Sequence, residues 1–399
     1  MKLDVARLIG ANDDSSQAAG ITITTALEPL AGPFAPVKPA VYAPARQGEP
    51  PRFQHDKRWR DDGSGPRSVG AIVIDNVPSQ ANRLEAALKD LSSTLGLPSL
   101  VLDLSGLGEL PPHIPKQLSS FEFPHRQADA YLRDALLDGE PFGKTDIGRA
   151  IFAATADDPL PLLQWFPQAL LFGFWQSHLG KKGSQAKLAR SWVSEIAGYE
   201  PASTDTGQLG LKGDPLNLPN EFVIEFDPDD PRDWSAAEGQ REKSKAAKGK
   251  KSDALSNVGH GQVPVSDPPP AAVSFASIEQ RSTVSFAALR RVKLPAEGRA
   301  LLVALGIAAH LGAFGRGFSL RSGCELRPSS AEGMWLGEAG DAAFDLPHFA
   351  EAQDLARDAI SAAGELGLPV GTAWQSKPLV LQPNPSLTKV ITASFPPLD

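Results

Sequence analysis

The spacing of apolar residues along the chain predicts both strands and helices. The segment from Ile21 to Leu27 alternates isoleucine and threonine with the period of a half-buried strand, and this strand is expected to start near Gly20. A second short strand is predicted from Ala71 to Ile74. A helix with Ser79 as its N-cap is expected next, because the following apolar residues share one helical face: Ala81, Leu84, Ala87, Leu88 and Leu91.

The same alternation of element types continues in the C-terminal part. A pair of strands is predicted within 272–286 and another strand over 318–326, with helices over 296–313 and 348–366. The helix over 296–313 is expected in the core, because its apolar run is shorter than the ~20 residues that span a bilayer. The later helix has one apolar face: Phe349, Ala352, Leu355, Ala359, Ile360 and Ala363.

Three further elements are predicted between these parts. Residues 126–137 have helical spacing, a short helix is expected near 145–154, and the run 169–175, Ala-Leu-Leu-Phe-Gly-Phe-Trp, is typical of a buried strand. The mixture of elements indicates an α+β fold. A split βαβ, ferredoxin-like arrangement with large insertions fits their order better than a doubly wound sheet, because no glycine-rich phosphate loop follows any strand.

Two long segments differ in composition from the rest of the chain. Residues 29–65 are dense in proline, glycine and charge, which indicates a long excursion from the core, and residues 227–272 combine aspartates, a lysine run and consecutive prolines. The second segment has too little apolar surface to fold alone and is expected to be flexible unless it orders on an RNA or a neighbour. We therefore expect a flexible N-terminus over 1–19 and a single domain over 20–399 that carries both insertions.

Composition narrows the class of protein. The chain has 399 residues, 41% of them hydrophobic and 22% charged, as in soluble globular proteins. Its single cysteine, Cys324, excludes an internal disulfide and a cysteine-built zinc site, and it suits a reducing cytoplasm. Asp4, Asp13 and Asp14 interrupt the N-terminal region where an export signal needs an apolar run, so a cytoplasmic protein is expected.

Positive charge is concentrated locally although the formal net charge is -8. Four cations and no acid follow the apolar run 169–175: Lys181, Lys182, Lys187 and Arg190. Such a loop, anchored to a buried element, indicates a polyanionic partner held at a defined place. The alternative is a solvated lysine loop without a partner.

Other candidates for anion binding are weaker when taken one at a time. Gln80, Asn82 and Arg83 occupy the first turn of a predicted helix, where backbone amides favour an anion, although they are equally consistent with solvated residues and an Arg83 ion pair. His260 lies in a glycine turn and either stacks on a base or faces solvent. A second run of cations follows Glu279: Arg281, Arg290, Arg291 and Lys293.

A catalytic centre is less well supported. His125, Asp129 and Asp134 lie near one another in the sequence, but general acid-base catalysis needs groups that converge on one substrate atom. Three polar residues along one predicted helix do not demonstrate such convergence, so structural roles are favoured for them.

Several motifs together resemble one known family. They are Ser79-Gln80-Ala81-Asn82-Arg83-Leu84-Glu85, His125-Arg126 with Asp129-Ala130 and Leu132-Arg133-Asp134, Leu170-Leu171-Phe172-Gly173 with Trp175 and Ser177, Ser194-Glu195-Ile196 with Gly198, Thr283 to Arg291, and Leu320-Arg321-Ser322 with Cys324. Their number and order resemble the Csb-one family, a GSU-type RAMP family that supplies the backbone (Cas-seven-type) subunit of the type I-G, formerly I-U, CRISPR interference complex. The resemblance covers about 21–326, with departures from the usual pattern at 39–42, Asn76 and Gln176.

The resemblance implies a non-enzymatic subunit with an RNA-recognition-like palm and no cofactor or metal. Several copies would line up head to tail along one CRISPR RNA (crRNA) and hold its spacer open for pairing with target DNA, beside a large subunit and a Cas-five- or Cas-six-type subunit. A thumb-like insertion would be either 29–65 or 227–272. The implied crRNA contacts are Asn82, Arg83, Lys181, Lys182, Lys187, Arg190, Arg281, Arg290 and Arg291, and the first-turn Gln80 and the turn residue His260 are further RNA-binding candidates.

Two other classes of function stay open at this stage. Some RAMP relatives cleave RNA with a loop aspartate or a histidine, and the candidates for such chemistry are Asp75, His125, Asp134 and His178. A scaffold that binds only proteins is the third class.

Overall fold

The computed structural model describes most of the chain and divides it into two units. The described residues are 2–43, 52–61, 63–176, 187–202, 211–212, 215–216, 218, 223–228, 230, 232–236, 251–260, 263–264, 272–337, 340–374 and 377–395. The first unit comprises Met1–Pro39, His55–Pro201 and Ser274–Asp399, and the second comprises Ala40–Gln54 and Ala202–Val273.

An antiparallel sheet forms the centre of the first unit. Its strands are β1 (Gly20–Pro29), β4 (His55–Asp61), β5 (Pro66–Asp75), β12 (Trp192–Pro201), β18 (Phe275–Ser285), β19 (Phe318–Arg321), β20 (Cys324–Gly337) and β21 (Gly340–Phe344). Their order is β19-β20-β1-β18-β12-β5-β4, with β21 paired to β20. In β1, Ile21 and Ile23 are buried while Thr22 and Thr24 are half-buried, which is the alternation expected of a strand with one face on the core.

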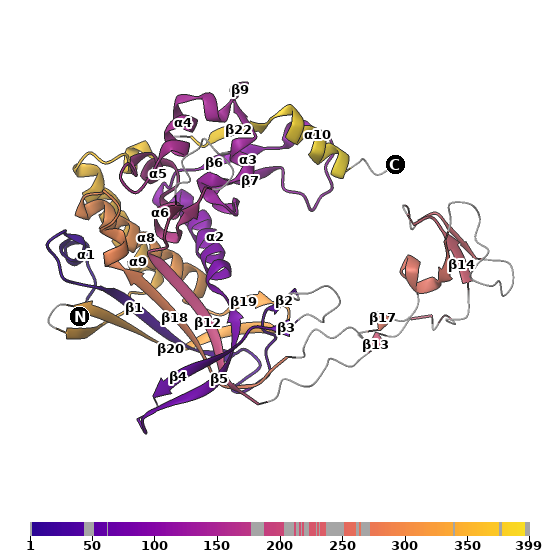
Figure 1. The fold of residues 1–399 in the computed structure, drawn as a ribbon, viewed down its shortest axis with the longest axis horizontal. Coiled ribbons are helices and arrows are strands. Elements are labelled where there is room, and N and C mark those ends of the chain that lie inside the picture. The colour runs from indigo at the N-terminus through magenta and orange to yellow at the C-terminus, as the bar shows by residue number, and fades with distance from the viewer. Residues whose placement is uncertain are drawn as a thin grey trace. The chain divides into compact units, whose positions relative to one another are not determined.

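Helices lie against one side of this sheet (Figure 1). They are α1 (Val5–Asn12), α2 (Val77–Leu95), α8 (Ala296–Phe314) and α9 (Phe349–Glu365), and α8 contacts each of the other three. Among the described residues, α8 alone is long and apolar enough to cross a membrane, with a mean hydropathy of 1.3, but 78% of it is buried inside the protein. The packing of α8 therefore fits the predicted core helix.

A smaller sheet lies beyond α2. It contains β6 (Leu100–Asp103), β7 (Gln117–Ser119), β8 (Ala135–Leu137), β9 (Glu140–Pro141) and β22 (Leu379–Pro383), in the order β7-β6-β22-β8-β9. Nearby segments form α3 (Ala130–Arg133), α4 (Asp146–Ala153), α5 (Leu160–Trp165), α6 (Pro167–Phe172) and α10 (Pro385–Ser394). The short hairpin of β10 (Phe174–Trp175) and β11 (Lys187–Leu188) follows α6.

The second unit contains only short described elements. They are β2 (Val41–Tyr42), β3 (Arg52–Phe53), β13 (Leu211–Lys212), β14 (Val223–Phe226), β15 (Trp234–Ala236), β16 (Lys251–Ala254), the 3-10 turn Leu255–Val258 and β17 (Val263–Pro264). The strands β15, β14 and β16 form a sheet, and Ile224 and Phe226 of β14 pack with Leu255. Part of the segment 227–272 thus has regular structure that its composition did not predict.

The predictions that rest on a regular spacing of apolar residues are confirmed. Strand β1 and helices α2, α4, α8 and α9 lie where the apolar spacing placed them, and the predicted apolar face of α2 is buried. Two details differ: the N-cap of α2 is Asn76, whose side chain accepts a hydrogen bond from the Ser79 amide, and Phe349 of α9 is 41% exposed.

Other predictions are wrong. The run 169–175 is mostly helical, because α6 extends to Phe172. The predicted helix 126–137 is divided into the 3-10 turn Arg126–Ala128, the single turn of α3 and strand β8. The segment 272–286 contains one long strand instead of two, and 318–326 is the start of a hairpin that turns at Gly323. Residues 55–61, expected to be irregular, pair with β5 as strand β4. The segment 1–19 contains α1, whose Leu8 is fully buried, and its flexibility stays a prediction.

Candidate nucleic-acid interface

A groove of about 790 Å³ lies where the β10–β11 hairpin meets the start of α2. Its lining comes from residues 77–78, 124–126, 172–175, 187–190 and 193. Among the described residues of this lining, Arg126, Lys187 and Arg190 are the cations and none is acidic. We call this feature the cationic groove.

The floor of the cationic groove is fixed by a buried ion pair. Both oxygens of Glu85 accept hydrogen bonds from Arg126, Nε to Oε1 and Nη2 to Oε2, each at 2.8 Å. Arg126 Nη1 also donates to the Gly173 carbonyl at 2.9 Å. Burial raises the pKa of the Glu85 carboxyl to about 7, against the opposing effect of Arg126. Arg126 therefore ties α2 to the base of the hairpin, and its charge is already partnered.

Arg190 and Lys187 are the exposed cations of the groove. Partial burial lowers the pKa of Arg190, and the positive charge of Arg126 lowers it further, while Glu85 acts in the opposite direction. An arginine stays protonated despite such a shift, and only the smaller contribution of Arg126 reflects a nearby positive charge. A phosphate group placed beside Arg190 would relieve the repulsion between the two guanidinium groups.

The position of these cations depends on a close backbone approach at Gly173. Gly173 has φ +72, and a Cβ atom there would lie 2.6 Å from the Leu188 carbonyl oxygen. The Ser191 amide donates to the Leu171 carbonyl at 2.9 Å, which joins the end of α6 to the chain that leads into β12. Glycine is thus required for the hairpin to lie against α6 with Lys187 and Arg190 at the groove.

A second hollow of about 280 Å³ adjoins the cationic groove on the uncovered face of the main sheet, and Val77 and Val193 line both. Its cations are largely neutralised. Arg58 Nη1 lies 2.6 Å from Glu195 Oε2. Glu279 pairs with Arg60 at 3.3 Å and with Arg281 at 2.8 Å. This hollow therefore continues the groove in space but offers a weaker positive potential.

Asp75, at the end of β5, organises the first turn of α2. It is fully buried and accepts hydrogen bonds from Ser79 Oγ at 2.8 Å, Gln80 Nε2 at 2.5 Å, Arg83 Nε at 3.0 Å and Arg321 Nη2 at 3.2 Å. The Oε1 atom of Gln80 also accepts hydrogen bonds from Ser194 and Gln280. Gln80 is fully buried, so we correct its predicted role in RNA contact to a structural one. Arg83 is partly exposed but paired with Asp75.

The remaining predicted contacts are spread over different places. Asn82 is exposed on α2, and Arg291 is exposed but lines neither hollow. Arg290 is half-buried and donates to the carbonyls of Ala11 and Ala18, so it holds the N-terminal segment, and its RNA contact stays a prediction. Lys181, Lys182 and His178 lie outside the described residues. His260 belongs to the second unit, where its ring centroid is 5.5 Å from that of Trp234.

Sequence reasoning missed Arg58 and Arg60, which line the second hollow. Both belong to β4, a strand that was expected to be irregular chain. The order Arg58-Trp59-Arg60 was the available signal, because two cations that alternate with another residue lie on one face of a strand.

Two of the described candidate catalytic residues, Asp75 and Asp134, are engaged by neighbouring side chains. Asp75 is enclosed by its hydrogen-bond donors, and Asp134 pairs with Arg133, Nη2 to Oδ2 at 2.6 Å. His125 lines the cationic groove, and its backbone amide donates to Asp129. Among the described residues, no three His, Cys, Asp or Glu side chains are grouped as a metal site.

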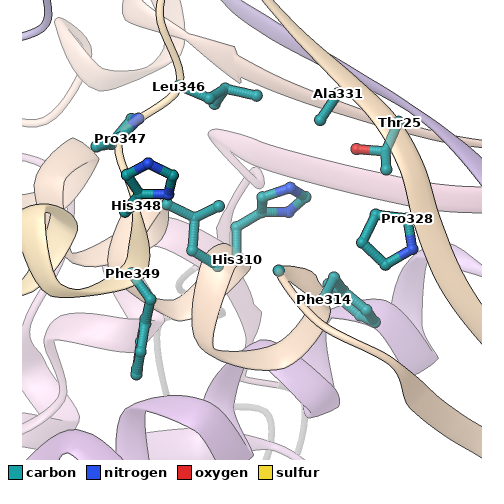
Figure 2. Close-up of a pocket in the computed structure, with 11 residues that line it drawn as sticks. Thr25, His310, Phe314, Pro328, Ala331, Leu346, Pro347, His348 and Phe349 are labelled. Carbon is teal, nitrogen blue, oxygen red and sulfur yellow. The ribbon is translucent and has the colours of Figure 1, made fainter.

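Figure 2 shows a separate pocket of about 210 Å³ where α8, α9 and the sheet meet. Two histidines line it, His310 and His348, but no lysine or arginine does. Burial lowers the pKa of His310 to about 4, so this imidazole is neutral near pH 7. The pocket therefore lacks the positive charge that phosphate binding requires.

Comparison with known proteins agrees with the resemblance found in the sequence. Residues 21–202 match the family model described as CRISPR-associated protein GSU0053. The matched range includes the whole cationic groove, whereas the motifs at 283–291 and 320–324 lie beyond it. A search of curated proteins gives no match. Over residues 21–202, slightly less than half of its length, the chain is thus similar to the GSU0053 family of CRISPR-associated proteins.

Proposed function

We propose that this protein is a non-catalytic, crRNA-binding backbone subunit of a type I-G (I-U) CRISPR surveillance complex. The observation that carries the proposal is the cationic groove, where exposed Lys187 and Arg190 stand beside a fixed Arg126 without any acidic residue in the lining. A backbone subunit must hold any spacer sequence, so it needs contacts to phosphate and ribose and must leave base edges free for pairing. Arginine and lysine side chains in an acid-free groove meet that requirement.

The strand order supports a RAMP fold with a ferredoxin-like, RNA-recognition-like palm. Strands β1, β12, β18 and β20 lie in the spatial order β20-β1-β18-β12 and are antiparallel to their neighbours. Helix α2 precedes β12 and helix α8 precedes β20, as in a split βαβ arrangement. Strands β5 and β4 extend this sheet beyond β12, and the second hollow lies beside that extension.

The net charge of -8 is compatible with a nucleic-acid-binding role. Negative charge over most of the surface disfavours stray binding to nucleic acid, while the groove stays locally positive. Many copies tethered to one crRNA bind with high avidity even if each site is weak, and unlike surfaces that meet head to tail generate a filament. The proposed partners are therefore crRNA, target DNA, further copies of this chain, the large subunit and a Cas-five- or Cas-six-type subunit, all in the cytoplasm.

Co-expression with a CRISPR array tests this proposal. The purified protein should carry crRNA, seen as excess absorbance at 260 nm and identified by sequencing. A Lys187→Ala, Arg190→Ala double variant should retain much less RNA, whereas Arg316→Ala, at an exposed arginine outside both hollows, should retain it. Protein that is folded but free of RNA in the wild type would favour a scaffold that binds only proteins.

An RNA endonuclease is the second candidate function, because His125 lies among the cations of the groove. Incubation with crRNA and with complementary RNA, with and without magnesium, separates the two functions. The backbone role predicts intact RNA in every reaction. Specific cleavage that is lost in His125→Ala would support the enzyme instead.

A further inference from the structure

Trp175 is an exposed aromatic residue on the wall of the cationic groove. Its side chain is 60% exposed, whereas Trp192 and Trp374 are almost completely buried. A single exposed aromatic residue is common on protein surfaces, so the observation that matters is its place on the wall of a concave cationic site.

The backbone beneath Trp175 is well anchored. Phe174 and Trp175 pair with Leu188 and Lys187 in the β10–β11 ladder, and Phe174 is 7% exposed. The close approach of Gly173 to the Leu188 carbonyl and the hydrogen bond from Arg126 to the Gly173 carbonyl fix the start of β10. The indole therefore stands on a fixed base, which lowers the entropy that ligand binding costs.

Two cations lie near the indole. Lys187 Nζ lies over the Trp175 ring, 6.0 Å from its centroid, and Arg190 lines the same groove. A nucleotide carries a flat base at one end and a phosphate at the other, so a ring beside cations matches both groups at once. The volume of about 790 Å³ lies within the range of sites that enclose a small ligand.

We propose that Trp175 is a base-stacking platform that takes one unpaired nucleotide of the bound strand, with the adjacent phosphates at Lys187 and Arg190. This inference rests on the proposed RNA-binding function and adds the requirement for an unpaired base. Stacking engages the face of the base, so its pairing edge stays free and any of the four bases is accepted. A duplex would not bind in this way, because its bases are stacked on one another.

Fluorescence anisotropy with labelled oligouridine, and with an abasic strand of the same length, tests the proposal. Trp175→Ala should weaken binding to oligouridine by roughly 5- to 100-fold while the salt dependence stays that of the wild type. Trp175→Phe should retain most of the affinity. Binding of the abasic strand should be the same in all three proteins, and Phe349→Ala, at an exposed aromatic outside the groove, is the control.

The possible results separate this inference from the proposed function. A wild-type protein that binds neither strand would contradict RNA binding itself. Salt-dependent binding that is unchanged in Trp175→Ala would overturn the stacking platform alone. If that variant binds RNA normally but no longer assembles into filaments, the indole contacts a neighbouring copy instead of a base.

Discussion

The two exposed cations of the groove offer the sharpest test of where RNA binds. Replacing Lys187 or Arg190 by alanine removes one positive charge from a site whose lining contains no acid. Neither side chain has a carboxylate ion-pair partner in the described structure, so each variant leaves no buried charge unpaired. The fold should therefore survive, and the loss should appear in RNA affinity.

The size of the effect follows from counterion release. Each phosphate contact on a single strand contributes about 0.7 to the slope of log K against log salt concentration. We expect each single variant to lower this slope by roughly 0.7 and the double variant by roughly 1.4. Between about 1 M and about 0.15 M salt, a slope of 0.7 corresponds to roughly fourfold in affinity for each contact.

The assay is a salt titration of binding to a labelled oligouridine short enough to hold one copy of the protein. Arg316→Ala is the matched control, since it removes an exposed arginine outside both hollows. Arg291→Ala should also leave the slope unchanged, because Arg291 lines neither hollow. A wild-type slope in the double variant would refute the assignment of these cations to the RNA path, as would an equal loss in Arg316→Ala.

Three further predictions concern the structure that supports the groove. Arg126→Ala leaves the buried Glu85 carboxylate unpaired and should lower the free energy of unfolding by about 3–5 kcal/mol in urea titrations, and a loss below about 1 kcal/mol would contradict the ion pair. The pKa of His310 is about 4 in the folded protein and 6.5 for an ordinary histidine. The free energy of unfolding should therefore be highest above pH 6.5 and should fall by up to about 3 kcal/mol as the pH drops toward 4. Thermal melts should show this loss in the wild type but not in a folded His310→Gln variant, and equal pH profiles would contradict it. Gly173→Ala should cost about 1–2 kcal/mol and weaken RNA binding because φ there is +72, whereas unchanged circular dichroism melts and anisotropy would show that the close approach is not needed.

Elements with a clear period were predictable from the sequence, and elements buried on every side were not. Helix α2 was recognisable because its apolar residues recur on one face and its opposite face is polar. In α6, Ala169 to Phe172 are all buried, so the run has no polar face to reveal its period and looks like a strand. Strand β4 depends on pairing with β5, which local composition does not disclose.

The candidate site was predictable only in part, for a similar reason. Sequence reasoning found Lys187 and Arg190 as part of an acid-free cationic loop. It also included Arg290, whose guanidinium donates hydrogen bonds to the Ala11 and Ala18 carbonyls. The sequence alone does not show which arginines are already hydrogen-bonded within the protein. The role of Arg126 depends on Glu85, a residue of another element, so its position in the fold is needed to assign it.

Electron microscopy of the protein co-expressed with a CRISPR array tests the central claim most directly. The account predicts a continuous RNA strand that passes through the cationic groove of successive copies, with phosphates at Lys187 and Arg190 and a base on Trp175. RNA that runs along another face of the first unit, with the groove filled by protein or solvent, would contradict it.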